Sequence, residues 1–128
     1  MAQHLHAVAL LVPDYDAGLA FYVGKLGFTC VSDIALENGK RWVLIQPQGS
    51  QTHLLLAKAH GPEQDAAIGQ QTGGRVGFFL HTDSFDRDVA HMRTQGITFE
   101  EEPRDEPYGK VVVWRDPFGN RWDLLQLN

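Results

Sequence analysis

Two charged residues near the end of the chain, Arg121 and Asp123, have the types and the spacing of a chemical site. Residues 121–125 are expected to form a β-strand, in which successive side chains point to opposite faces of the sheet. Arg121 and Asp123, two residues apart, therefore share one face. A carboxylate on that face is either half exposed or enclosed in a polar cavity. Its role is an ion pair with an arginine or general-base catalysis among apolar walls.

A turn at residues 116–120 precedes this strand and closes a pattern that occurs twice along the chain. Asp14 marks the start of one helix and Asp83 or Ser84 the start of another, while Gly27 and Gly96 mark the helix ends, thirteen residues after Asp14 and Asp83. Strands are predicted at 7–12, 28–34, 40–46 and 52–58, and again at 75–82, 97–101, 110–115 and 121–125. The first helix is expected to bury the stripe Leu19, Tyr22, Val23 and Leu26.

This repeat predicts an α+β fold built from two βαβββ modules in a single domain that covers residues 1–128. The first module covers about 4–58 and the second about 74–127, with a linker at 59–73 that contains one helical turn at 63–68. In each module the helix covers one face of the sheet. We expect the other faces to curve around a shared cleft.

Composition excludes several classes of protein. The 128 residues are 43% apolar and 21% charged, which is typical of one globular domain. The net charge of −5, without any Lys/Arg run, argues against a nucleic-acid partner. Residues 7–12 are too short to span a membrane, and no secretory signal is expected. With Cys30 as the only cysteine, no internal disulfide forms, and we expect a cytoplasmic protein.

Three stretches of the chain resemble a known family. They are Val12-Pro13-Asp14-Tyr15-Asp16, then Phe21-Tyr22 with Leu26-Gly27-Phe28, and finally residues 116–124, Asp-Pro-Phe-Gly-Asn-Arg-Trp-Asp-Leu. Together with the paired modules they make nearly the whole chain similar to the vicinal oxygen chelate proteins, the glyoxalase/bleomycin-resistance/extradiol-dioxygenase group. The resemblance is specific for the fold and not for one reaction.

The resemblance implies one metal ligand on the first and on the last strand of each module, all facing the cleft. In this chain the four positions hold Ala7, Leu55, Gly77 and Asp123, so a single carboxylate is left. Because a divalent metal needs at least three protein ligands, the usual site is expected to be mostly lost.

A rearranged ligand set is the alternative for the metal. His53, His81 and Asp123 together would supply two histidines and a carboxylate, the set that non-haem iron enzymes use. Fe, Mn, Ni or Zn is the divalent metal that such a site would take. Asp123 and His53 are therefore the candidate metal ligands, and Asp123 is the candidate catalytic residue.

Strand alternation predicts which side chains face the cleft. The candidate ligand-binding residues around Asp123 are Arg41, His53, Phe79, His81, Val113 and Arg121. The three tryptophans Trp42, Trp114 and Trp122 are expected in the helix-packed core, unless a bulge turns them into the pocket. The acidic run 100–102 is interpreted as a solvated strand end.

Two functions compete on this basis. An apolar cleft edged by arginines suits a small anionic or amphipathic molecule, which favours a metal-free binding protein like the drug-binding resistance proteins of the family. The family also implies a homodimer, in which the modules pair within one chain or exchange between two. The alternative is a metal-dependent glyoxalase-like lyase or isomerase, or a dioxygenase. Neither function involves nucleic acid or a membrane.

Overall fold

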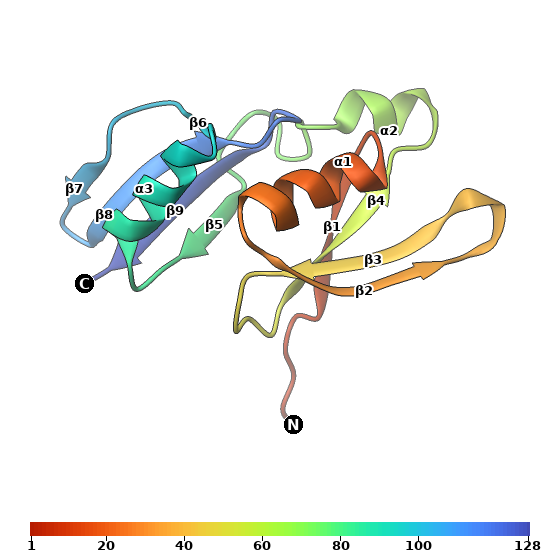
Figure 1. Ribbon diagram of the computed structural model, residues 1–128, viewed down its shortest axis with the longest axis horizontal. Coiled ribbons are helices and arrows are strands. Elements are labelled where there is room, and N and C mark those ends of the chain that lie inside the picture. The colour runs from red at the N-terminus through yellow and green to blue at the C-terminus, as the bar shows by residue number, and fades with distance from the viewer. The chain divides into compact units, whose positions relative to one another are not determined.

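The computed structural model describes residues 1–128 and divides the chain into two compact units, Met1–Ile68 and Gly69–Asn128 (Figure 1). Each unit contains one β-sheet and one principal helix that packs on it. No helix in either unit has the length and apolar character needed to cross a membrane.

The first unit contains a four-stranded sheet in the order β1-β4-β3-β2. Its strands are β1 (Ala7–Val12), β2 (Thr29–Ala35), β3 (Arg41–Gln46) and β4 (His53–Lys58). Strand β1 runs parallel to β4, and the other pairs are antiparallel. A 3-10 turn, η2 (Glu37–Gly39), links β2 to β3, and helix α2 (Gly61–Ala67) follows β4 and contains most of the helical turn expected at 63–68.

Helix α1 (Tyr15–Leu19) and the π-helical turn η1 (Ala20–Lys25) form the helix of this unit. The helix begins at Asp14, where the side chain accepts a hydrogen bond of 3.1 Å from the Asp16 amide. It packs tightly on the sheet at Gly18, where an added Cβ would lie 2.9 Å from the Leu56 side chain.

The stripe of this helix that becomes buried differs from the predicted one. Of the four expected residues only Tyr22 is fully buried, and Tyr15 and Phe21 are buried in place of the others. The prediction assumed 3.6 residues per turn along the whole helix. The π-helical turn η1 is wider, so the residues after Leu19 are rotated relative to that pattern.

The second unit contains the sheet β5-β9-β8-β6, with a short further strand that pairs with β8. The elements are β5 (Phe78–His81), α3 (Phe85–Thr94), β6 (Thr98–Phe99), β7 (Arg104–Glu106), β8 (Gly109–Arg115) and β9 (Arg121–Leu127). Strand β5 is parallel to β9, whereas β8 is antiparallel to β9. Strand β7 is an element that the sequence pattern did not predict, and β5 and β6 are shorter than expected.

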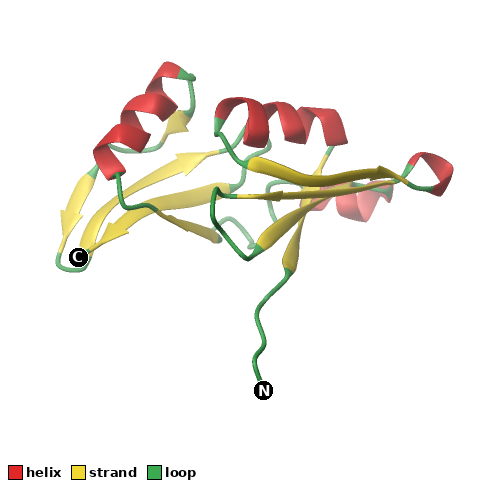
Figure 2. Cartoon of the chain, turned by 60° about the horizontal axis from the view of Figure 1, so that its bottom comes forward, coloured by secondary structure: helices red, strands yellow, loops and turns green.

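Helix α3 covers one face of this sheet, as Figure 2 shows. Its Phe85, Val89 and Met92 are buried. The Gln126 side chain of β9 accepts a hydrogen bond of 2.9 Å from the Phe85 amide and so fixes the start of the helix on this face. Residues of β8 and β9 with the same parity as Gln126 therefore form the core under α3.

The centre of that core is aromatic. Trp114 and Trp122 are buried and stacked with ring centroids 5.0 Å apart, and Phe78 stacks on the other side of Trp122 at 4.8 Å. The prediction that these two tryptophans belong to the helix-packed core is confirmed.

The prediction for Trp42 and Arg41 on β3 is wrong. Strand β3 pairs with β4 so that Val43 lies opposite Leu56, the residue that contacts Gly18 of α1. Arg41 and Val43 consequently lie on the helix-covered face, while Trp42 lies on the opposite face and is 40% exposed. Both parities of β3 are apolar, so only the register with β4 decides which of them faces the helix.

The α+β fold of two βαβββ modules is confirmed by the order and pairing of these elements. The single-domain boundaries and the cleft shared by the two modules remain predictions.

Candidate functional site

Most of the predicted site residues lie on the face of the second sheet that α3 leaves uncovered, here called the free face. Strand register brings them together, because Phe79 of β5 and Val113 of β8 are both direct partners of Asp123 on β9. The free face consists of Phe79, His81, Val111, Val113, Arg121, Asp123 and Leu125.

These residues differ in their contact with solvent. Val111 and Val113 are buried and form an apolar floor, whereas the Phe79 ring is 59% exposed. Asp123 is half-buried between them, and His81 is exposed two residues beyond Phe79. The free face therefore offers one carboxylate with an apolar surface on either side.

Arg121 does not pair with the neighbouring Asp123. Its Nε and Nη2 atoms donate to the two carboxylate oxygens of Glu100 at 2.8 and 2.9 Å, and its Nη1 donates to the Gly74 carbonyl at 3.0 Å. Arg115 also donates to Glu100 at 2.8 Å. These hydrogen bonds hold the pKa of Glu100 below its usual value, and those from Arg121 have the largest effect.

A second arginine near Asp123, Arg104 of β7, is engaged in the same way. Its Nε donates to both carboxylate oxygens of Glu101 at 3.0 Å, and its Nη1 donates to Glu106 at 2.6 Å. Glu101 also accepts a hydrogen bond of 3.0 Å from the Val113 amide. The acidic run is thus more than a solvated edge, because Glu100 and Glu101 bind the arginines that surround the site.

Asp123 is left without a hydrogen bond or an ion pair of its own. Burial raises the pKa of its carboxyl group, and the negative charge of Glu101 adds to this effect, while Arg104 and Arg121 oppose it from a distance. The sequence prediction missed Glu100, Glu101 and Arg104. Only the run of acidic residues before β7 signalled that carboxylates were available.

Replacing Asp123 by asparagine should stabilise the protein more at pH 7 than at pH 4. The pKa of Asp123 in the folded protein lies above the usual 3.8. As the pH rises from the unfolded-state pKa to the folded-state pKa, the unfolded state loses this proton first, and the folded state becomes less stable relative to it. The neutral asparagine removes that penalty. Urea unfolding at both pH values measures the difference.

Asp105→Asn, at an exposed position on β7, controls for the change in net charge. A gain in the free energy of unfolding from Asp123→Asn that is the same at pH 4 and pH 7 would contradict the prediction.

The candidate residues of the first unit do not join one site. Arg41 donates to Asp16 at 2.9 Å and to Asp33 at 2.7 Å on the helix-covered face, and its guanidinium lies over the Tyr15 ring. The assignment of Arg41 to the cleft-facing side is therefore wrong. His53 lies on the opposite face, with its Nδ1 atom 2.9 Å from the His6 carbonyl oxygen and its ring against that of His6.

The ligand positions that the fold family implies hold few donor groups. Ala7 and Leu55 have no atom that binds a metal. Gly77 has no side chain, and an added Cβ there would meet the Thr72 methyl group, which would have to move. Within neither unit do three His, Cys, Asp or Glu side chains come together in an arrangement that would hold a metal ion.

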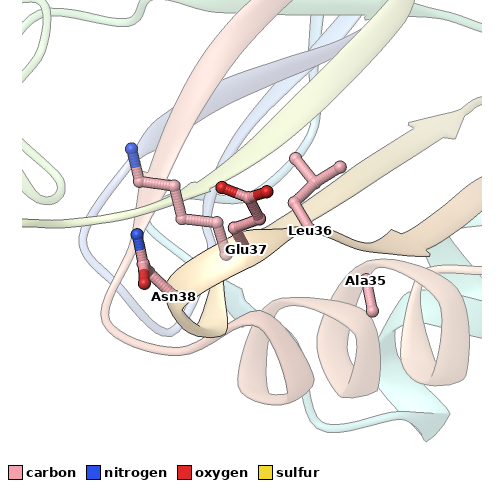
Figure 3. Close-up of a pocket in the computed structure, with 5 residues that line it drawn as sticks. Ala35, Leu36, Glu37 and Asn38 are labelled. Carbon is pink, nitrogen blue, oxygen red and sulfur yellow. The ribbon is translucent and has the colours of Figure 1, made fainter.

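A separate hollow lies at the end of the β2–β3 hairpin in the first unit. Ala35, Leu36, Glu37, Asn38 and Lys40 line it. In Figure 3 Leu36 and Glu37 point to one side of the hairpin, and the Ala35 methyl group points to the other. One hairpin supplies all of these residues, so the hollow is open and lacks opposing walls.

Comparison with known proteins agrees with the fold. The model of the Glyoxalase/Bleomycin resistance protein/Dioxygenase superfamily matches residues 4–124, and the chain belongs to this superfamily. An uncharacterized protein from Shewanella frigidimarina (strain NCIMB 400) is 49% identical over all of this chain and 96% of its own length.

Two solved structures share the fold over nearly their whole length. UcmS2 superposes with a TM-score of 0.83 at 30% identity and covers 98% of each chain. TnmS3, an antibiotic binding protein from Streptomyces sp. CB03234, superposes with a TM-score of 0.80 at 28% identity, covering 99% of this chain and 98% of its own.

Proposed function

We propose that this chain is a small-molecule-binding protein that holds an amphipathic ligand on the free face, around Asp123. The observation that carries the proposal is a half-buried carboxylate without a bonding partner, set between a buried valine floor and the exposed ring of Phe79. Ligand sites typically combine an apolar lining with a few polar groups of this kind. The similarity to TnmS3, which is an antibiotic binding protein, supports the same reading.

We further propose that binding takes place without the metal site usual in the superfamily. The support is chemical, because the side chains of Ala7 and Leu55 supply no ligand atom and Gly77 has no side chain. Asp123 then has no partner ligands in its own unit and serves to bind the small molecule directly.

A homodimer in the cytoplasm completes the proposal. Exposed apolar side chains such as Ile34 and Trp42, which are cross-strand partners in the first sheet, offer surface for association. Cys30, exposed and without a disulfide, suits a reducing compartment.

Titration with naphthylethanol, a neutral aromatic amphipath, tests the binding site. In amide-resolved NMR spectra we expect saturable shifts at Phe79, Val113 and Asp123, and we expect Phe79→Ala to weaken binding by about tenfold, because the ring supplies much of the apolar contact. Light scattering of the same samples should give twice the chain mass of 14.3 kDa.

Tyr108→Ala is the control for Phe79→Ala, because it also removes an exposed aromatic ring from the second unit. Phe99→Ala would be less suitable, since the Phe99 ring lies under the guanidinium of Arg93. Shifts confined to the hollow at the β2–β3 hairpin, or an unchanged affinity in Phe79→Ala, would refute the placement of the site. A scattering mass of one chain would refute the dimer.

A further inference from the structure

The arginines near Asp123 are already occupied, and this limits which ligands the free face can take. All three guanidinium nitrogens of Arg121 donate to Glu100 or to the Gly74 carbonyl. Arg104 uses two of its nitrogens for Glu101 and Glu106. The glutamates already neutralise the charge of these guanidinium groups, so an anionic ligand would gain less from them than from an unpaired arginine.

Because of the same ion pairs, the Asp123 carboxylate has no hydrogen-bond donor within the protein. Glu100 and Glu101 take the guanidinium groups that would otherwise neutralise it, so both of its carboxylate oxygens remain available as acceptors. Its half-buried position makes an incoming charged donor more strongly bound than it would be in water. Burial raises the pKa of this carboxyl group, in keeping with a carboxylate short of partners.

Phe79 supplies an aromatic surface next to this carboxylate. It is the direct strand partner of Asp123, and its ring is 59% exposed. A ring that stands free beside a carboxylate can stack on an aromatic ligand, and its face also attracts a cation. Val113, buried on the other side of Asp123, extends the apolar surface beneath such a ligand.

We infer that the free face takes an aromatic molecule bearing an ammonium group or another strong hydrogen-bond donor, with the donor on Asp123 and the ring on Phe79 and Val113. This inference rests on the proposed function and narrows it, since it favours a cationic amphipath over an anionic one. The arginines that suggested an anion in the sequence act instead as counterions for glutamates.

Three probes that share one ring system test the inference: naphthylethylamine, naphthylethanol and naphthylacetate, which are cationic, neutral and anionic at pH 7. NMR titration of the full chain gives the affinity and the position of each. We expect naphthylethylamine to bind about tenfold more tightly than naphthylacetate, with naphthylethanol between them. The preference should disappear in Asp123→Asn and in Asp123→Ser, two replacements that differ in size.

The chain has a net charge of −5, which attracts any cation. The control must therefore remove one negative charge, as Asp123→Asn does, at a position away from the free face. Asp105→Asn, an exposed carboxylate on β7, does this and should keep the preference for the amine. Probes that bind the free face with equal affinity, a preference for naphthylacetate, or an amine preference that survives both Asp123 variants would overturn the inference alone. Failure of all three probes to shift the free-face amides would overturn the proposed function as well.

Discussion

Replacing Asp116 by alanine is expected to lower the free energy of unfolding by about 3 kcal/mol or more. Asp116 and Asn120 are both buried in the turn between β8 and β9. The Asp116 carboxylate accepts from the Phe118 amide at 2.9 Å, from the Asn120 amide at 2.8 Å and from the Asn120 side chain at 2.7 Å. Alanine leaves these donors without this acceptor in a buried turn.

Urea unfolding of three variants separates this effect from a general loss of charge. Asp116→Asn keeps one side-chain acceptor oxygen and should lose less stability than Asp116→Ala. Asp105→Ala, at an exposed position, should change stability by no more than about 0.5 kcal/mol. Equal losses in Asp116→Ala and Asp105→Ala would show that the turn does not depend on the buried carboxylate.

Trp114→Ala is expected to cost about 3–5 kcal/mol, the usual range for deleting a large aromatic side chain from a core. Trp114 is completely buried beneath α3 and stacks on Trp122, so its removal opens a cavity at the centre of the second unit. The free energy of unfolding from urea titration, followed by far-ultraviolet circular dichroism, measures the loss.

Trp42→Ala provides a matched control, because the same atoms are deleted from a side chain that is 40% exposed. It should cost clearly less than Trp114→Ala, since less apolar surface returns to water and a smaller cavity forms. A loss as large as that of Trp114→Ala would mean that Trp42 is covered in solution, as it would be in the proposed dimer.

The ion pairs that hold the strands of the second unit together are also the reason why Asp123 on the free face lacks a partner. The two glutamates that bind the arginines hold β7 and the end of β6 against β8 and β9, and they leave Asp123 unpaired as a consequence. An unpaired, half-buried carboxylate is costly to keep, and a ligand that donates to it would offset that cost. Ligand binding should therefore stabilise the second unit most strongly for donor-bearing probes.

The repeated module and most of its elements follow from local patterns in the sequence. Local chemistry is sufficient for these, since Asp14 begins a helix through its own side chain and the glycines Gly27 and Gly96 adopt the positive φ that ends one. The period-two pattern of β8 and β9 likewise identified the buried faces of Trp114 and Trp122. Such features depend on residues within a few positions of one another.

The chemistry of the site depends on contacts that form only when the sheet folds. Whether Arg41 faces the helix depends on the register of β3 with β4, and both faces of β3 are apolar enough to be buried. Arg121 has an acid two residues away, yet it binds Glu100, 21 residues distant in sequence, because the sheet places that carboxylate within reach. Ion pairs follow distance and geometry in the folded sheet, and spacing along one strand does not encode them.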